Sequence, residues 1–135
     1  MNLKRYLAFV QDHLYSRQDI TIEELFIEEI EPEVAAIVEG RLRYWDGSML
    51  KFVEQLVLRG AVLTKPRYAY HYQDGDGALV LRYDNVAHHP EIATHPHHKH
   101  VQTGTRRGQT VIAASPPSLP EVLQEIERHL YDSAD

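Results

Sequence analysis

The sequence contains no cysteine among its 135 residues. Disulfide bridges and thiolate metal sites are therefore excluded, and nothing requires an oxidising compartment. The chain also lacks an apolar run near the roughly 20 residues that a membrane-spanning helix needs. Its first stretch, MNLKRYLAFVQDHLYS, mixes charged and apolar residues too closely for the apolar segment of a signal peptide. We therefore expect a cytoplasmic protein with no membrane partner.

Several catalytic motifs are missing as well. There is no Gly-x-Ser-x-Gly elbow, so a nucleophilic hydrolase has little support. The sequence has no HExxH helix, and its glycines do not have the spacing of a phosphate-binding loop. The DGDG tetrad at 74–77 lacks the remaining ligands of a calcium-binding loop and is typical of a hairpin turn.

Charge is unevenly distributed along the chain. The formal net charge of −6 counts against a protein that coats nucleic acid through a general basic surface. Eight acidic residues and no Lys or Arg lie between Asp19 and Glu39, whereas the part from Arg82 to Arg107 has four Lys or Arg residues and two acids. A polyanion could therefore bind the later part despite the overall sign.

Helical spacing marks both ends of the chain. Apolar residues recur at Leu3, Leu7, Val10 and Leu14, with Asn2 as an N-cap. A second apolar stripe follows SPPS near the C-terminus, where Ser118 and Glu121 have the spacing of a capping box. These patterns predict an N-terminal and a C-terminal helix.

The middle of the chain predicts strands. Isoleucines and threonine in ITIEELFIEEIE favour a strand over residues 20–31, and TVIAA favours a short one near residue 112. The segment VAAIVEGRLRYWDGSMLKFVEQLVL predicts a hairpin whose three-residue loop, Asp46-Gly47-Ser48, pairs Tyr44 with Leu50 and Leu42 with Phe52. Its polar face carries Arg41, Arg43, Trp45 and Lys51.

A second hairpin is predicted in RYAYHYQ-DGDG-ALVLRYD. Its tyrosines share one face, and Arg67, His71, Arg82 and Asp84 share the other. Together the elements predict one α+β domain over residues 1–135, a mostly antiparallel sheet of about five or six strands flanked by the two helices.

Six of the nine histidines lie in the stretch NVAHHPEIATHPHHKH, at 85–100. Pro90 and Pro96 keep this stretch from forming a helix, and His98 and His100 project to the same side if their segment is extended. A metal site, an acid–base site and a plain polar loop all fit this composition.

The first two interpretations use overlapping residues. A divalent transition metal needs about three protein ligands plus water, which Asp84, His88 or His89, His98 and His100 could supply. Cleavage of RNA without a metal needs a base, an acid and fixed cations. Histidines would then be the acid and base, with Arg82 and Lys99 on the phosphate.

The run from Arg67 to His100 resembles the signature of the TumE-like toxins of prokaryotic type II toxin–antitoxin pairs. The similarity lies in an aromatic–His strand, a short turn, an R-Y-D-N strand end, His-His-Pro and then Pro-His-His-Lys-His. The preceding hairpin from Trp45 to Phe52 fits as well. The resemblance implies a small toxin neutralised by an antitoxin, often a DNA-binding protein, with RNA as the usual target of toxins of this size.

We therefore expect a toxin that is a metal-independent endoribonuclease and needs no cofactor. The expected catalytic residues are His88, His89, His98, His100 and Asp84, and the expected substrate-binding residues are Arg82, Lys99, His71, Arg41 and Arg43. One alternative is a metal-dependent hydrolase or nuclease with His88, His98 and His100 as ligands. Another is a non-catalytic binding protein that uses the Arg41, Arg43 and Lys51 face. The expected partners are RNA, an antitoxin and, in a homo-oligomer, a second copy of the chain.

Overall fold

A computed structural model of the protein describes residues 2–104 and 108–132, so Arg106 and Arg107 of the basic part lie outside the described residues. The elements are α1 (Leu3–Tyr15), β1 (Ile20–Glu31), β2 (Ala35–Tyr44), β3 (Met49–Arg59), β4 (Val62–Gln73), β5 (Leu79–Asp84), β6 (His98–Gln102), β7 (Gln109–Ala113) and α2 (Leu119–Asp132). The predicted helices, the strand over 20–31 and the α+β class are confirmed. The described strands number seven, so the expected five or six were too few, and the strand that was missed is β6.

Both helices begin as the sequence predicts. The Asn2 side chain accepts a hydrogen bond from the backbone N–H of Arg5 at 2.8 Å. Ser118 and Glu121 form the reciprocal capping box, with the Glu121 N–H donating to the Ser118 hydroxyl at 3.2 Å. Neither helix in the described ranges is long and apolar enough to cross a membrane.

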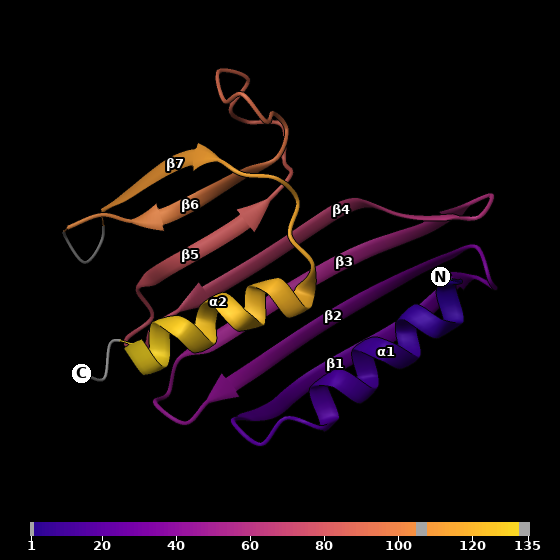
Figure 1. Ribbon diagram of the computed structural model, residues 1–135, viewed down its shortest axis with the longest axis horizontal. Coiled ribbons are helices and arrows are strands. Elements are labelled where there is room, and N and C mark those ends of the chain that lie inside the picture. The colour runs from indigo at the N-terminus through magenta and orange to yellow at the C-terminus, as the bar shows by residue number, and fades with distance from the viewer. Residues whose placement is uncertain (1, 105–107, 133–135) are drawn as a thin grey trace.

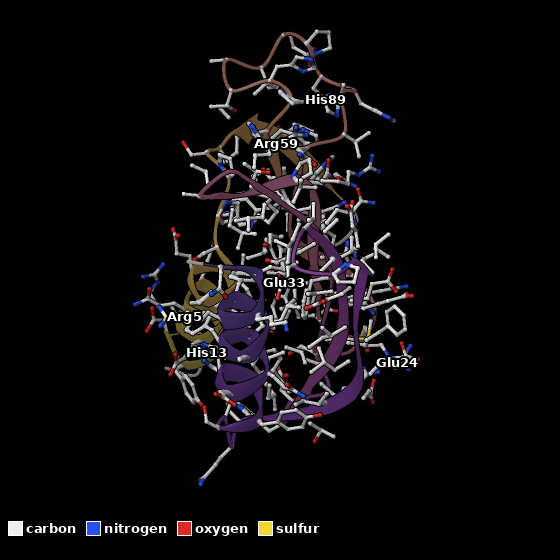
Figure 2. All side chains as sticks on the ribbon, turned by 90° about the vertical axis from the view of Figure 1, so that its right-hand side faces the viewer. Arg5, His13, Glu24, Glu33, Arg59 and His89 are labelled. Atoms are coloured by element: carbon white, nitrogen blue, oxygen red, sulfur yellow. The ribbon has the colours of Figure 1, made fainter. Side chains whose placement is uncertain are left out.

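The seven strands form one antiparallel sheet in the order of the chain, from β1 at one edge to β7 at the other. Both helices lie on the same face of this sheet (Figure 1). The opposite face, called here the open face, is covered by neither helix of the described residues, and Glu24 lies on that side (Figure 2). Because neighbours in the chain are neighbours in the sheet, the acidic early part and the imidazole-rich later part lie at opposite ends of one surface.

The hairpin between β2 and β3 has a different register from the predicted one. Its three-residue loop is Trp45-Asp46-Gly47, because the Gly47 N–H donates to the Tyr44 carbonyl at 3.0 Å and the Tyr44 N–H donates to the Ser48 carbonyl at 2.9 Å. Gly47 has a φ of +86°, the left-handed conformation that glycine adopts without strain, and this places it at the last loop position. Leu42 therefore pairs with Leu50. Since the partner moves by two residues, each side chain keeps its predicted face.

A buried carboxylate joins the helices to the sheet. Glu54 on β3 is 0% exposed and accepts hydrogen bonds from the hydroxyls of Tyr6 on α1 and Tyr70 on β4. The Lys65 ammonium lies 3.6 Å from the Glu54 carboxylate and donates to the Pro117 carbonyl, just before α2, at 2.6 Å. Burying a charge is tolerated when it is paired and hydrogen-bonded in this way.

Replacing Glu54 with Ala should therefore destabilise the fold strongly. The change leaves Lys65 without its counter-charge and two tyrosine hydroxyls without an acceptor, for a loss of about 3–5 kcal/mol. Tyr6→Phe removes a single hydrogen bond to the same carboxylate and should cost about 1.5 kcal/mol. Urea denaturation measures both free energies of unfolding, and equal losses would contradict the role given to Glu54.

Candidate functional site

The centre of the site is a buried pair on the open face, Asp84 on β5 and His98 on β6, which stand opposite each other in the ladder. Asp84 is 4% exposed and His98 is 2% exposed. The His98 Nε2 lies 3.0 Å from Asp84 Oδ1, and its Nδ1 donates to the Pro96 carbonyl at 2.9 Å. Both ring nitrogens therefore face oxygen atoms, which fixes the orientation of the ring.

Asp84 has further donors around it. The Arg82 Nε donates to Asp84 Oδ2 at 2.9 Å, and the Val86 backbone N–H donates to Oδ1 at 3.0 Å. Burial by itself would raise the pKa of Asp84, but the Val86 and Arg82 hydrogen bonds and the charges of His98 and Arg82 bring it below its usual value. Asp84 is thus a stable carboxylate at neutral pH.

Two more histidines complete a cluster around this pair. His100 on β6 stands opposite Arg82, and His89 comes from the loop between β5 and β6. The imidazole cluster is defined here as His89, His98 and His100, which each offer a ring nitrogen, all within 4.8 Å of one another. The ring centroids of His89 and His100 are 5.8 Å apart, and each lies 5.0 Å from the ring centroid of His98.

The two outer rings of the cluster are accessible. The side chain of His100 is 18% exposed and that of His89 is 30% exposed. The His100 Nδ1 donates to the Gln109 side-chain oxygen at 2.9 Å, and the His89 Nδ1 lies 3.4 Å from the Glu91 carboxylate. Burial lowers the pKa of His100, and it stays lowered although Gln109 and Asp84 act in the opposite direction.

Hydrogen bonds hold the loop that carries His89. The Asn85 amide donates to the Pro66 carbonyl at 2.9 Å and accepts from the Tyr68 N–H at 3.1 Å, which ties the start of the loop to β4. The His95 Nδ1 donates to the His89 carbonyl at 3.1 Å. The loop forms one end of the molecule, with His89 near its base (Figure 2).

Other histidines near the site lie outside the imidazole cluster. His88 is exposed, and the structure does not bring it into the imidazole cluster. His97 stacks on Tyr68 at 5.8 Å between ring centroids and hydrogen-bonds to its hydroxyl at 2.9 Å. His71 on β4 stands opposite Arg82, with its Nδ1 3.4 Å from the Arg82 guanidinium, so it borders the site.

The other sequence-predicted cations are not at the cluster. Lys99 lies on the helix-covered face, where its ammonium bonds to Glu125 on α2 and lies 4.9 Å from the centre of the Tyr83 ring. Arg41 and Arg43 lie on the open face, and each forms a 3.1 Å ion pair with Glu23. These pairs leave the two arginines less positive towards an anion than their number suggests.

Sequence reasoning missed Gln109 as a partner of His100. Gln109 begins β7, and β6 pairs with β7 so that Gln102 stands opposite Gln109. The signal was available in the turn-like Gly104 to Gly108 stretch, which joins two segments of equal length. Reading the two segments as a hairpin would have predicted both β6 and this contact.

The sequence matches the model of a known protein family. Residues 9–130, which is most of the chain, match the family model described as "Toxin TumE". Comparisons with curated proteins and with solved structures find no match.

Asp84→Asn should loosen the whole site. The amide keeps the shape of the side chain but removes the charge that holds Arg82 and His98, so we expect a loss of about 3 kcal/mol in the free energy of unfolding. Asp12→Asn on the exposed face of α1 is the matched control and should change stability by less than about 0.5 kcal/mol. Chemical denaturation of both variants decides the point, and a loss as small for Asp84→Asn as for the control would contradict the central role of this carboxylate.

Proposed function

Because the chain belongs to the TumE toxin family, we propose that this toxin acts as an endoribonuclease whose acid–base pair is His89 and His100. The observation that supports this most directly is the 5.8 Å separation of two accessible imidazoles, one of which, His100, stands opposite Arg82 in the sheet. Two groups at this separation can flank a phosphate, one near the attacking oxygen and one near the leaving oxygen.

His100 is the better candidate for the general base. Its Nδ1–H donates to Gln109, so the lone pair resides on Nε2, and its lowered pKa favours the neutral ring at neutral pH. A neutral Nε2 can take the proton of a ribose 2′-OH, whose oxygen then attacks the adjacent phosphorus.

His89 and Arg82 supply the remaining parts. His89 is the more exposed ring, and its Nδ1 lies 3.4 Å from the Glu91 carboxylate, which orients the ring. As the general acid it donates a proton to the leaving 5′-oxygen. Arg82 uses its Nε to hold Asp84, and its terminal amino groups, one of which also lies 3.4 Å from His71 Nδ1, would stabilise the charge that develops on the phosphorane.

Asp84 and His98 act as positioning residues in this proposal. Both are buried, so neither meets a substrate directly, but Asp84 fixes Arg82 and the ring of His98. Lys99 has no part in it, because its ammonium is bound on the opposite face.

Membership of a toxin family implies an antitoxin as partner. That this antitoxin binds DNA, and that the toxin forms a homo-oligomer, stay predictions. The proposal of RNA as substrate rests on the chemistry of the site and on the cations beside it.

His100→Ala and His89→Ala should each lower the rate of RNA cleavage by about 10²- to 10⁴-fold, which is the usual contribution of a general acid or base. Cleavage of a mixed RNA substrate by the purified protein measures this. The matched control is His88→Ala, which removes the neighbouring exposed imidazole from the same loop and should leave the rate unchanged.

The outcomes separate the proposals. Full activity of the His100→Ala variant would contradict the acid–base pair. A protein that arrests growth of its host without cleaving RNA, and that tolerates loss of both histidines but not of Lys51, would instead be the non-catalytic binding protein.

A metal-dependent nuclease is the second candidate, and one observation favours it. Each imidazole of the cluster has its Nδ1 beside an oxygen, namely the Pro96 carbonyl, the Gln109 amide or the Glu91 carboxylate. Histidines that bind metals are commonly held in this way, with Nε2 left as the ligand atom. His89 and His100 could offer that nitrogen to Zn²⁺ or Ni²⁺ with a bound water, which the metal would activate for hydrolysis. The His98 Nε2 lies 3.0 Å from Asp84 Oδ1 and would have to leave that contact to become the third ligand.

Metal analysis distinguishes the two candidates. For the acid–base mechanism we expect less than stoichiometric metal after dialysis and cleavage that persists in EDTA. One equivalent of retained metal, loss of cleavage in EDTA and recovery with added Zn²⁺ would contradict it and support the metal site. His98→Ala serves as a check, because it should abolish retention of a metal at this site.

A further inference from the structure

A row of nitrogen-bearing side chains crosses the open face and ends at the imidazole cluster. In the strand registers, Lys51 on β3 stands opposite His71 on β4, His71 stands opposite Arg82 on β5, and Arg82 stands opposite His100 on β6. Side chains that stand opposite each other are direct neighbours in an antiparallel sheet. The row is therefore continuous from the middle of the sheet to the proposed base.

A groove follows this row. It has a volume of about 690 Å³ and extends from β1 to β5. Met49, Val53 and Ala69 give it an apolar part, and Lys51, His71 and Arg82 give it nitrogen donors. Grooves that bind single-stranded nucleic acid combine such cations with surface on which a base can lie.

The charges along the groove differ from one end to the other. At the β1–β2 end, Glu24 and Glu39 contribute to the lining, and the nearby Arg41 is paired with Glu23 at 3.1 Å and with Glu24 at 3.4 Å. Among the described residues, Lys51 makes neither a hydrogen bond nor an ion pair, so its ammonium is free to bind an anion. The positive part of the groove thus lies on the side of the imidazole cluster.

We propose that this groove is a second phosphate subsite, which binds the backbone of single-stranded RNA next to the phosphate held at Arg82. The proposal rests on the proposed ribonuclease function and adds the path of the substrate. Lys51 contacts the neighbouring phosphate, and the apolar part accommodates the base attached to it. The carboxylates at the β1–β2 end repel the backbone and so limit how far the strand extends.

The test measures binding separately from cleavage. A fluorescent single-stranded RNA with 2′-O-methyl groups throughout cannot be cleaved by attack of its 2′-oxygen, so its affinity for the wild-type chain is read by anisotropy over a range of salt concentrations. Lys51→Ala should weaken binding and lower the slope of log K against log[salt] by about 0.7, the value for one phosphate contact on a single strand. Lys51→Glu should weaken binding further.

The matched control is Arg41→Ala, which removes the cation directly opposite Lys51 on β2 but one that is already ion-paired. It should leave the slope unchanged, and thermal melting checks that both variants are folded. Equal slopes for wild type, Lys51→Ala and Arg41→Ala would overturn the subsite.

Cleavage of unmodified RNA by the same proteins keeps the two proposals apart. If wild type cleaves RNA and Lys51→Ala does so with an unchanged KM, the ribonuclease function stands and the subsite is wrong. If binding depends on Lys51 but nothing is cleaved, the subsite stands and the ribonuclease function is wrong. If the chain neither binds nor cleaves RNA, both are wrong.

Discussion

The arrangement of the site depends on the contacts that the buried Asp84 carboxylate makes. A buried carboxylate costs several kcal/mol unless donors replace the water that it has lost. Here two donors and one close imidazole come from three places, since Arg82 lies on the same strand, the His98 ring on the next strand and Val86 in the loop between them. The same contacts that make the buried charge tolerable therefore fix the end of β5, the start of β6 and the beginning of the loop that carries His89.

The simple order of the strands decides where the charges of the sequence lie. In a sheet whose strands follow the order of the chain, distance along the sequence becomes distance across one surface. The acidic strand β1 thus forms one edge, where Glu23 neutralises Arg41 and Arg43. Lys51, which forms no ion pair with any other described residue, and the imidazoles lie further along. A net charge of −6 is compatible with a locally positive path for this reason.

The parts of the fold that could be predicted are those with a periodic apolar signal. Both helices and the faces of the central hairpins follow from such periodicity, and even the wrong register left the faces intact. β6 could not be found in this way, because HKHVQ has polar side chains on the open face and a lysine on the covered one. Lys99 is tolerated on the covered face because Glu125 on α2 binds its ammonium, a contact between segments that no local pattern reveals. The same limit explains why His88 and His89 looked equivalent in the sequence.

The oxygen atoms that hold the Nδ1 atoms of the cluster suit an acid–base site and a metal site equally. The two kinds of site differ in what they require of the His98 Nε2. Holding each Nδ1 on an oxygen orients an imidazole for proton transfer as well as for binding a metal. His100 and His89 keep Nε2 available for both purposes, although the His100 Nε2 lies 3.8 Å from Asp84 Oδ2, which is beyond hydrogen-bond distance. His98 does not, because its Nε2 lies only 3.0 Å from Asp84 Oδ1. A metal bound by all three rings would have to break this contact with the buried carboxylate, whereas an acid–base pair of His89 and His100 uses the cluster with that contact intact.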